Sequence, residues 1–516
     1  GTYSGYGIDS WGTMGNVKNV GLIVGIGNGE GRGISIGGTG KAQSISNDGF
    51  IIGISKADVG LGISTNIINN GVISSTSDIS SRPFYIYGKI SNIKNNGLVI
   101  GSSTEIGTSY GIYANGGGFG GAIRITNMGS IMGITLGNNA AGINNDNSTR
   151  MYIANNGLVM GIGASSSYGI YNLKTIDSIE FDNSILNGKN DTLKVSGTGN
   201  EILGSIINAY GTAVVFDTAG GELTLSGTNV NGSVEEISNS IIGSGNGDTL
   251  ILQSGEITYK NTTTGTENTV INGNIDMKAG TDTLTIGSGA VINGNVDMGA
   301  GDDILNFVNG AQTNGTIAGG IGSDILNFEK ALSARTASSN DDEIRILHSI
   351  SGFEKMNINT NVTLFEKTIK DDDATSTDLE VTGANEIKIN AGGVLTLRLD
   401  TTRLSDSKIV GHALYGNNGV ITSTGGGKLM LALNGAGNKS VVSFGDTALD
   451  GSLVTAYETK DKGKITFATT SLFHEVKRIA GKNNEVIILS LPNLPTDIAY
   501  EKLNEIYHSI LSVDEL

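Results

Sequence analysis

Aspartates that follow glycine turns are the residues of this sequence whose type and spacing could do chemistry. Residues 299–305 and 320–326 resemble a calcium-binding nonapeptide, and related turns occur at 245–248 and 280–282. A calcium roll needs such nonapeptides in tandem so that carboxylates from both sides share each ion, and here each repeat holds one. The pattern favours a stacked turn whose Asp caps backbone amides. Bound Ca²⁺ stays open as the alternative.

Other patterns that could indicate catalysis lack the required context. Residues 33–37 match the Gly-x-Ser-x-Gly pattern of hydrolases, but Ile34 and Ile36 alternate with Ser35 as in an ordinary strand, whereas the motif needs a strand, a turn and a helix. The glycine runs at 25–33 and 116–121 precede no helix that could bind a nucleotide. The histidines have no metal-ligand spacing. They are His348, His412, His474 and His508.

Carboxylate pairs do not indicate an acid/base site either. Asp302 and Asp303 are adjacent, so on a strand they point to opposite faces, which is the wrong geometry for a glycosidase pair. The basic residues form no cluster of the kind a polysaccharide lyase needs. We therefore expect no enzyme and assign no catalytic, cofactor-binding or metal-binding residue, while ligand-binding residues stay unknown. A β-helix enzyme that acts on polysaccharide is kept as the second alternative.

Aromatic residues concentrate in the first third of the chain and could stack on sugar rings or anchor a protein partner. The competing interpretation is an aromatic ladder that only packs one repeat on the next. These residues are Tyr3, Tyr6, Trp11, Tyr85, Tyr87, Tyr110, Tyr113, Tyr152, Tyr168 and Tyr171.

The elements that must position these residues are short strands in a repeat. Between residues 269 and 328 Asn-Gly pairs recur at a step of 21 residues, and the same step links Asp282, Asp303 and Asp324. A unit this short cannot bury its own apolar face and needs an identical neighbour stacked on it. Equivalent residues then lie about 4.8 Å apart, the spacing of paired strands. This pattern predicts a β-solenoid.

A looser repeat, Ile-x-Asn-x-Gly-x-Ile-x-Gly, fills the first 175 residues, with a Gly-Ile pair between its copies. Its copies lie at 17–25, 45–53, 67–74, 93–101, 125–133 and 153–161. Their variable separation predicts a constant rung with loops inserted at one corner. Asn and Gly suit the corners because they accept left-handed backbone angles, and stacked Asn side chains can hydrogen-bond from rung to rung.

The composition agrees with an exported repeat protein and excludes several partners. The 516 residues include 79 Gly, 3 Pro and no Cys, and the formal net charge is −17. Nucleic acid and anionic membranes need a basic footprint, so we expect neither as a partner. No apolar run is long enough to span a membrane as a helix. Since the chain begins within a repeat-like pattern, we interpret it as a piece of a longer protein.

We predict an all-β, right-handed parallel β-helix that ends in a short amphipathic helix, which caps the last rung or links it to a further domain. Residues 1–175 form rungs with loop insertions, 176–329 regular rungs, 330–378 irregular rungs with acidic loops, 379–491 a C-terminal stem that folds first, and 492–516 the helix.

The C-terminal third resembles the end of the passenger in large fusobacterial autotransporter adhesins of type Va. The resemblance rests on residues 350–358, 361–365, 411–419, 426–435 and 500–507. It implies a β-helix exposed on the surface of a Gram-negative bacterium and followed by the chain's own outer-membrane β-barrel, which is absent from this sequence. It also implies that the stem at 379–491 templates the rungs above it.

The function that follows as an expectation is non-catalytic attachment to other bacteria or to host cells, through a protein or glycan receptor. The first alternative is a lectin-like module that uses the tyrosine-rich first third. No cofactor is expected, with Ca²⁺ as the one open possibility. Positions where the repeat is interrupted, before residue 175 and after residue 330, are the expected places for binding surfaces.

Overall fold

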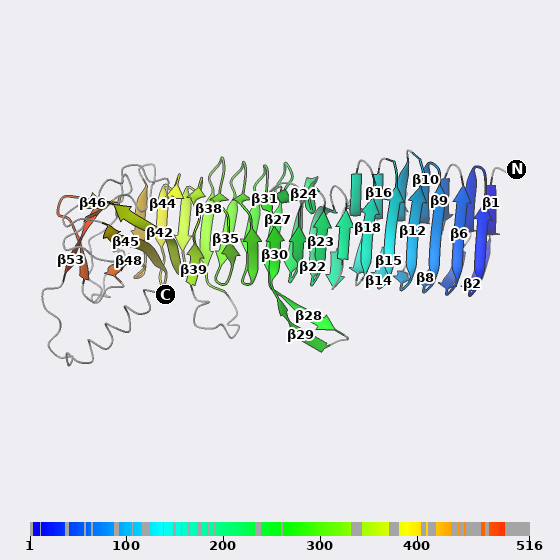
Figure 1. The fold of residues 1–516 in the computed structure, drawn as a ribbon, viewed down its shortest axis with the longest axis horizontal. Helices are drawn as coiled ribbons and strands as arrows, with labels where there is room; N and C mark the ends of the chain where they lie inside the picture. The colour runs from blue at the N-terminus through cyan, green and yellow to red at the C-terminus, as the bar shows by residue number, and fades with distance from the viewer. Residues whose placement is uncertain are drawn as a thin grey trace. The chain divides into compact units, whose positions relative to one another are not determined.

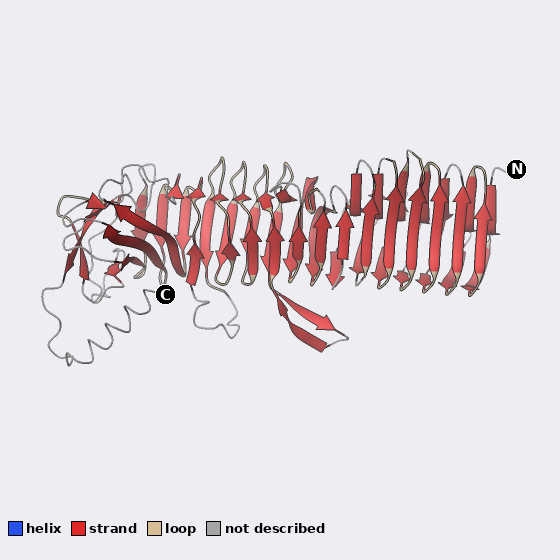
Figure 2. Ribbon diagram, in the orientation of Figure 1, coloured by secondary structure: helices blue, strands red, loops and turns tan. Residues whose placement is uncertain are grey.

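The computed structural model of the chain is all-β, with long parallel sheets of the kind a β-helix contains (Figure 1). It describes residues 4–10, 12–36, 41–55, 58–62, 66–86, 92–105, 107–115, 123–137, 139–147, 151–155, 157–163, 166–172, 178–182, 185–188, 192–209, 211–232, 239–259, 262–331, 343–370, 381–403, 409–410, 419–434, 441–443, 448–449, 466–469 and 474–490. Within these ranges the chain consists of strands, turns and loops, without a helix (Figure 2). The predicted fold class is confirmed, whereas the predicted helix at 492–516 lies outside the described residues.

The chain divides into two compact units, Gly1–Thr360 and Asn361–Leu516. The five finer segments expected from the sequence stay predictions. The first unit contains the Asn-Gly repeats, the Gly-x-Asp turns and the aromatic residues, so the candidate sites lie within it.

In the first unit each rung contributes three strands, and equivalent strands of successive rungs pair in parallel to form three faces. The first face starts with β1 (Ser4–Ser10), β4 (Glu30–Ile36), β7 (Asp58–Gly62), β10 (Ser80–Ile86), β13 (Thr108–Asn115), β16 (Asn139–Asn147) and β19 (Ser166–Asn172). The second starts with β2 (Thr13–Asn19), β5 (Lys41–Asn47), β8 (Asn66–Asn69), β11 (Asn92–Asn95), β14 (Ile123–Asn127), β17 (Met151–Asn155) and β20 (Ser178–Asp182).

The third face runs from the loose repeats into the regular repeats without a bridging strand. It comprises β3 (Leu22–Ile26), β6 (Phe50–Ser55), β9 (Val72–Ser77), β12 (Leu98–Ser103), β15 (Ser130–Thr135), β18 (Leu158–Ile162), β21 (Ile185–Gly188), β23 (Ile206–Ala209), β25 (Asn229–Asn231), β30 (Thr269–Asn272), β33 (Ala290–Asn293) and β36 (Gln312–Thr313). Short strands that recur in every rung agree with the repeat unit predicted from the sequence.

Each face sends one column of apolar side chains inward, and together these columns form a thin layered core. On the second face Ile45, Ile67, Ile93, Ile125 and Ile153 are paired in register, and all are at most 2% exposed. Burial of each such side chain stabilises the fold by roughly 1.5–3 kcal/mol. The core therefore grows in proportion to the number of rungs, as expected for a solenoid.

Buried asparagines form a ladder at the corner between the second and third faces. The Nδ2 of Asn47 donates to the Oδ1 of Asn69 at 2.8 Å, and the Nδ2 of Asn69 donates to the Oδ1 of Asn95 at 2.7 Å. The ladder runs from Asn19 to Asn155, so the predicted rung-to-rung bonding is confirmed.

The glycine of the Gly-Ile pairs allows the first and third faces to approach closely. A Cβ on Gly111 would lie 2.7 Å from the Cγ2 of Ile131, and one on Gly33 would lie 2.5 Å from the Cγ2 of Ile51. The Ile that follows each of these glycines, Ile112 or Ile34, points into the core and is fully buried. The pair thus sets the thickness of the rung.

Two long strands bridge the first and second faces between the loose and the regular repeats. These are β22 (Leu193–Leu203), which pairs with both β19 and β20, and β24 (Val214–Ser226). The faces then continue separately. The first continues as β26 (Asn239–Ile242), β31 (Asn274–Asp276), β34 (Val296–Asp297), β37 (Ile317–Ala318) and β40 (Ile350–Ser351), and the second as β27 (Thr249–Gln253), β32 (Thr283–Ile286), β35 (Ile304–Val308), β38 (Ile325–Glu329) and β41 (Lys355–Ile358).

The 21-residue register is confirmed by the pairing of Leu284 with Leu305 and of Leu305 with Leu326. Two further elements leave the pattern. An antiparallel hairpin of β28 (Gly255–Tyr259) and β29 (Thr262–Glu267) projects from the corner before β30 (Figure 1), which the sequence analysis did not predict. The strand β39 (Glu343–Ile346) follows residues 332–342, so most of the first predicted acidic loop lies outside the described residues.

The second unit also contains parallel strands. One series is β42 (Asn361–Lys370), β45 (Val394–Arg403), β48 (Lys428–Asn434) and β51 (Thr466–Thr469), and another is β44 (Glu386–Ile389), β47 (Val420–Ser423) and β50 (Ala448–Leu449). The remaining strands are β43 (Val381–Thr382), β46 (Ile409–Val410), β49 (Val441–Ser443), β52 (His474–Arg478) and β53 (Glu485–Ser490), with β53 antiparallel to β49 and β52. Strand residues are therefore present within the segment 379–491 that the sequence analysis assigns to a stem.

Candidate functional site

The aspartates of the Gly-x-Asp turns form a buried column between the first and second faces. Asp282, Asp303 and Asp324 are fully buried. The backbone N–H of Asp282 donates to the Oδ1 of Asp303 at 2.8 Å, and that of Asp303 donates to the Oδ1 of Asp324 at 2.9 Å. Each carboxyl thus accepts from the equivalent amide of the neighbouring rung, as the amide-capping interpretation predicts.

The column extends by one residue at each end. The N–H of Asp248 donates to the Oδ1 of Asp282 at 2.7 Å, and the N–H of Asp324 donates to the Oε2 of Glu354 at 2.6 Å. The Oδ2 atoms of Asp282, Asp303 and Asp324 are buried without a hydrogen-bond partner. An ionised carboxylate with an unsolvated oxygen is costly, so this environment favours the protonated acid.

Burial is the main cause of raised pKa values in this column. It raises the pKa of Asp282 to about 7 against the hydrogen bond from Asp248, and the charges of Asp303 and Asp248 raise this pKa further. Burial also raises the pKa of Asp324 to about 6, with the charges of Asp303 and Glu354 acting in the same direction. The pKa of Asp303 and that of Asp248 are raised for the same first reason.

The column could hold protons, but a substrate cannot reach it because the three central carboxyls have no exposed surface. Asp302 is exposed while Asp303 is buried, as expected from their alternation. Within the described residues no group of three His, Asp or Glu side chains is placed to hold a metal ion. The calcium alternative remains untested by this arrangement.

The remaining sequence candidates do not converge. Ser35 lies within β4, buried and paired with Asp9, so the Gly-x-Ser-x-Gly match is a strand as expected. His348 is half-buried beside β39, and His474 starts β52 in the second unit. His412 and His508 lie outside the described residues.

Several of the tyrosines share a column with arginines on the outer side of the first face. Tyr6 pairs with Arg32, and the guanidinium carbon of Arg32 lies 5.9 Å from the ring centre of Tyr6. The guanidinium carbon of Arg82 lies 4.4 Å from the ring centre of Tyr113, whose ring stacks on that of Tyr110 at 5.2 Å. Such contacts are cation–π interactions.

This tyrosine–arginine column continues in register through Ala141 to Tyr168. Tyr6, Tyr110 and Tyr168 are half-buried, whereas Tyr113 is 7% exposed. Nothing is described for Tyr3, Trp11 and Tyr87, nor for the side chains of Tyr85, Tyr152 and Tyr171. The described rings therefore fit the packed aromatic ladder and also leave partly open ring surface for a ligand.

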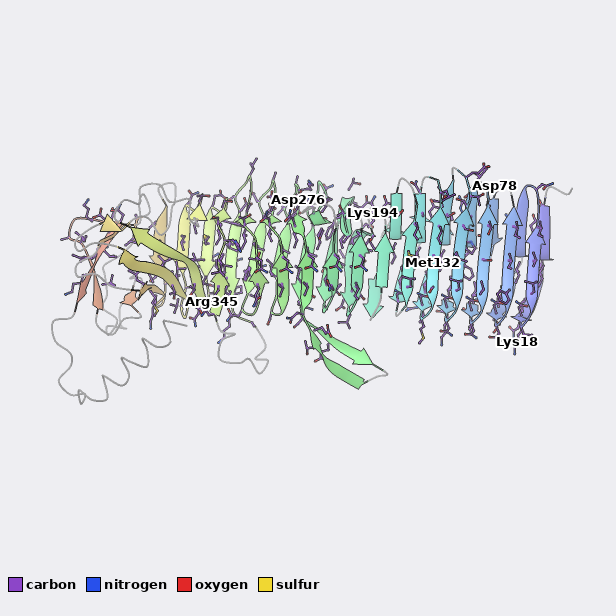
Figure 3. The ribbon with its side chains drawn as sticks, in the orientation of Figure 1. Lys18, Asp78, Met132, Lys194, Asp276 and Arg345 are labelled. Carbon is purple, nitrogen blue, oxygen red and sulfur yellow. The ribbon has the colours of Figure 1, made fainter. Side chains whose placement is uncertain are left out.

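The outer side of the third face carries an apolar surface that the sequence analysis missed. Three columns of side chains point outward from β3, β6, β9, β12, β15 and β18, and none of these side chains is charged. This apolar face comprises Leu22, Val24, Ile26, Phe50, Ile52, Ile54, Val72, Ser74, Thr76, Leu98, Ile100, Ser102, Ser130, Met132, Ile134, Leu158, Met160 and Ile162. Leu22 is 65% exposed and Phe50 is 51% exposed. Met132, which belongs to the same apolar face, is labelled in Figure 3.

A signal for this surface was present in the sequence as continuous apolar runs at 22–24, 50–52, 98–100 and 158–160. Successive residues of a strand point to opposite sides, so three consecutive apolar residues cannot all enter the core. The second face behaves differently, because its outward positions include Lys18, Lys94 and Arg124.

No helix within the described ranges has the length and apolarity that a membrane span requires. In comparisons with known proteins, no family model and no curated protein sequence matches this chain.

Proposed function

We propose that this chain is a non-catalytic attachment protein of the bacterial cell surface, a segment of the passenger of a type Va autotransporter adhesin. The observation that supports this most is that the inner and outer side chains of each rung have different roles. The apolar and buried polar columns, including the Asp column, are used for stacking, while aromatic and apolar side chains repeat along the outside of the first and third faces. Extended faces of stacked repeats are typical binding surfaces of solenoid proteins.

The proposed location is the outer surface of a Gram-negative bacterium, and the proposed partner is a protein or glycan on another bacterium or on a host cell. The resemblance of residues 350–358 and 426–435 to fusobacterial adhesin passengers supports both. The acidic charge of −17 supports a receptor other than nucleic acid.

Binding of the labelled chain to bacterial and epithelial cells tests this function by flow cytometry. We expect saturable binding to at least one cell type that excess unlabelled chain displaces. A chain unfolded by heat and then cooled on ice is the control for adhesion of non-native protein. Absence of saturable binding to every cell type would contradict the proposal.

The second candidate function is glycan recognition by the tyrosine–arginine column. The supporting observation is that Tyr110 and Tyr168 are half-buried and occupy one outer column, with Arg82 close to Tyr110. Aromatic faces stack on sugar rings, and arginine donates to their hydroxyls. A glycan array should then lose signal with Tyr110→Ala and Tyr168→Ala but keep it with Ile68→Ala, which alters an exposed residue of the second face. Equal signals from all three variants would remove this candidate.

A further inference from the structure

The apolar face is comparable in size to the largest apolar patch of a typical soluble monomer, and such patches are often functional. Six strands at about 4.8 Å spacing and about five residues of 3.3 Å each cover roughly 500 Å². Exposed patches of several hundred Å² mark interaction surfaces, above all where polar residues surround them. Asp48, Asn70 and Asn96 border one side of the face, and Asp78, Thr104 and Glu105 follow its strands on the other. Exposed Val20 and Met128 interrupt the first border, and exposed Ile79 and Leu136 interrupt the second.

The apolar face covers only the first six strands of the third face and ends abruptly after them. Its central column runs through Ile100, Met132 and Met160, and the next positions in register are Asn187, Asn208 and Asn231. From Asn208 on the asparagines are bonded to one another, for example Asn231 Nδ2 to Asn208 Oδ1 at 2.8 Å and Asn293 Nδ2 to Asn272 Oδ1 at 2.8 Å. One column of the same sheet thus changes from apolar side chains to a self-satisfied polar ladder.

Charge limits which partner can cover this surface. The chain carries a net charge of −17, so two copies repel one another over most of their surfaces. The apolar face has no charged side chain at any outward position, so two copies can meet there without opposing like charges. Spacing gives the same preference, because the columns repeat at the rung distance and a second copy provides columns with an identical repeat.

We propose that the apolar face is a self-association surface, on which the same face of a second copy packs sheet on sheet. Two such faces would bury about 1,000 Å² in total, which reaches the lower limit for a specific interface. Facing sheets pack about 10 Å apart with interdigitated side chains. The association has two-fold symmetry, and with the axis along the stacking direction of the rungs each residue of the central column, Ile100 and Met132 among them, lies close to its own equivalent.

Sedimentation velocity over a range of concentrations tests the proposal with the full chain. We expect a reversible monomer–dimer equilibrium, with dimerisation weakened at least tenfold by Ile100→Asp and unchanged by Asn272→Asp on the polar part of the same face. Circular dichroism melts show whether each variant keeps the fold. A monomer at all concentrations, or a dimer that the folded Ile100→Asp variant leaves intact, overturns the proposal.

Cross-linking provides a second measurement, since the chain has no native cysteine. Met132→Cys should give a covalent dimer with a short bismaleimide, and Asn293→Cys should not. Flotation with phosphatidylcholine vesicles tests whether a lipid surface covers the apolar face instead of a second copy. A wild-type chain that floats with the vesicles and gives no Met132→Cys cross-link overturns self-association in favour of a lipid surface.

Discussion

Single carboxyl groups inside the rungs make the stability of this protein depend on pH. Asp282 and Asp324 have folded-state pKa values of about 7 and about 6, above the ordinary value of 3.8. Between pH 3.8 and the folded-state pKa values, the folded chain therefore binds more protons than the unfolded chain. The stability from the protonated carboxyls is fully present below about pH 3.8 and is lost as pH rises through 6 and 7.

We expect the free energy of unfolding to fall between about pH 4 and pH 7, the range between the ordinary and the folded-state pKa values. Asp282→Asn keeps the Oδ1 that accepts from Asp248 and removes the titrating group. This variant should show a shallower pH dependence and exceed the wild type in stability at about pH 8. Chemical denaturation at a series of pH values measures both. A wild-type stability that rises with pH, or equal slopes for the two proteins, contradicts the account.

One backbone position in the regular repeats holds an unfavourable residue. Lys278 has a φ of 75°, whereas the equivalent positions one and two rungs on are Gly299 and Gly320, with φ of 95° and 107°. A left-handed conformation costs a non-glycine residue roughly 1–2 kcal/mol. Lys278→Gly should therefore raise the free energy of unfolding by about 1 kcal/mol, despite the loss of the exposed ion pair with Asp276. Lys278→Ala keeps the strain and removes the same ion pair, so an equal effect of the two variants would contradict this explanation.

At the level of elements, the two asparagine ladders have unequal importance. Asn95 is fully buried and connects Asn69 to Asn127. Asn95→Ala removes both of these bonds and also the bonds that the Nδ2 of Asn95 donates to the carbonyls of Gly97 and Ser130. We expect a loss of about 2–4 kcal/mol. Asn293 belongs to the exposed ladder, where water replaces the lost bonds, so Asn293→Ala should cost less than about 1 kcal/mol. Denaturant titration of the two variants measures the difference, and equal losses would show that burial does not set the importance of a ladder.

The rung itself could be predicted from the sequence because its columns consist of distinctive residues. Three residue types recur in register: Asn at the corners, Gly where backbones approach and Asp in the turns. The stacking of Asn47 on Asn69 and of Asp282 on Asp303 follows from that repetition. The hairpin of β28 and β29 could not be predicted, because a single insertion has no counterpart in another rung. The apolar face was missed because an apolar residue was taken as a core residue, although Phe50 points outward beside the inward Ile51.

For the candidate sites, the residue types predicted the role of a side chain better than its surroundings in the fold. The capping role of Asp303 follows from its place in a glycine turn, but its raised pKa depends on burial between rungs, which the local sequence does not specify. The contact of Arg82 with Tyr113 joins residues of adjacent rungs that are 31 positions apart. Variable loops separate such residues in sequence, so only the register of the whole stack brings them together.

For the whole molecule, the faces, columns and surfaces described above all depend on one property, the in-register stacking of rungs in the first unit. Nitroxide labels on paired cysteines test this property directly. The pair Asn272→Cys with Asn293→Cys spans 21 residues, and the pair Ser102→Cys with Ile134→Cys spans 32, yet both pairs occupy neighbouring strands at the same register position.

We predict strong dipolar broadening of the electron paramagnetic resonance spectrum in both pairs, because neighbouring strands lie about 4.8 Å apart. The control pair Asn272→Cys with Asn306→Cys joins different faces, β30 and β35, and should show weaker coupling. Equal, strong broadening in the first two pairs supports the stack whatever the loop length. Uncoupled spectra from either pair would contradict the rung register on which the proposed attachment and self-association surfaces rest.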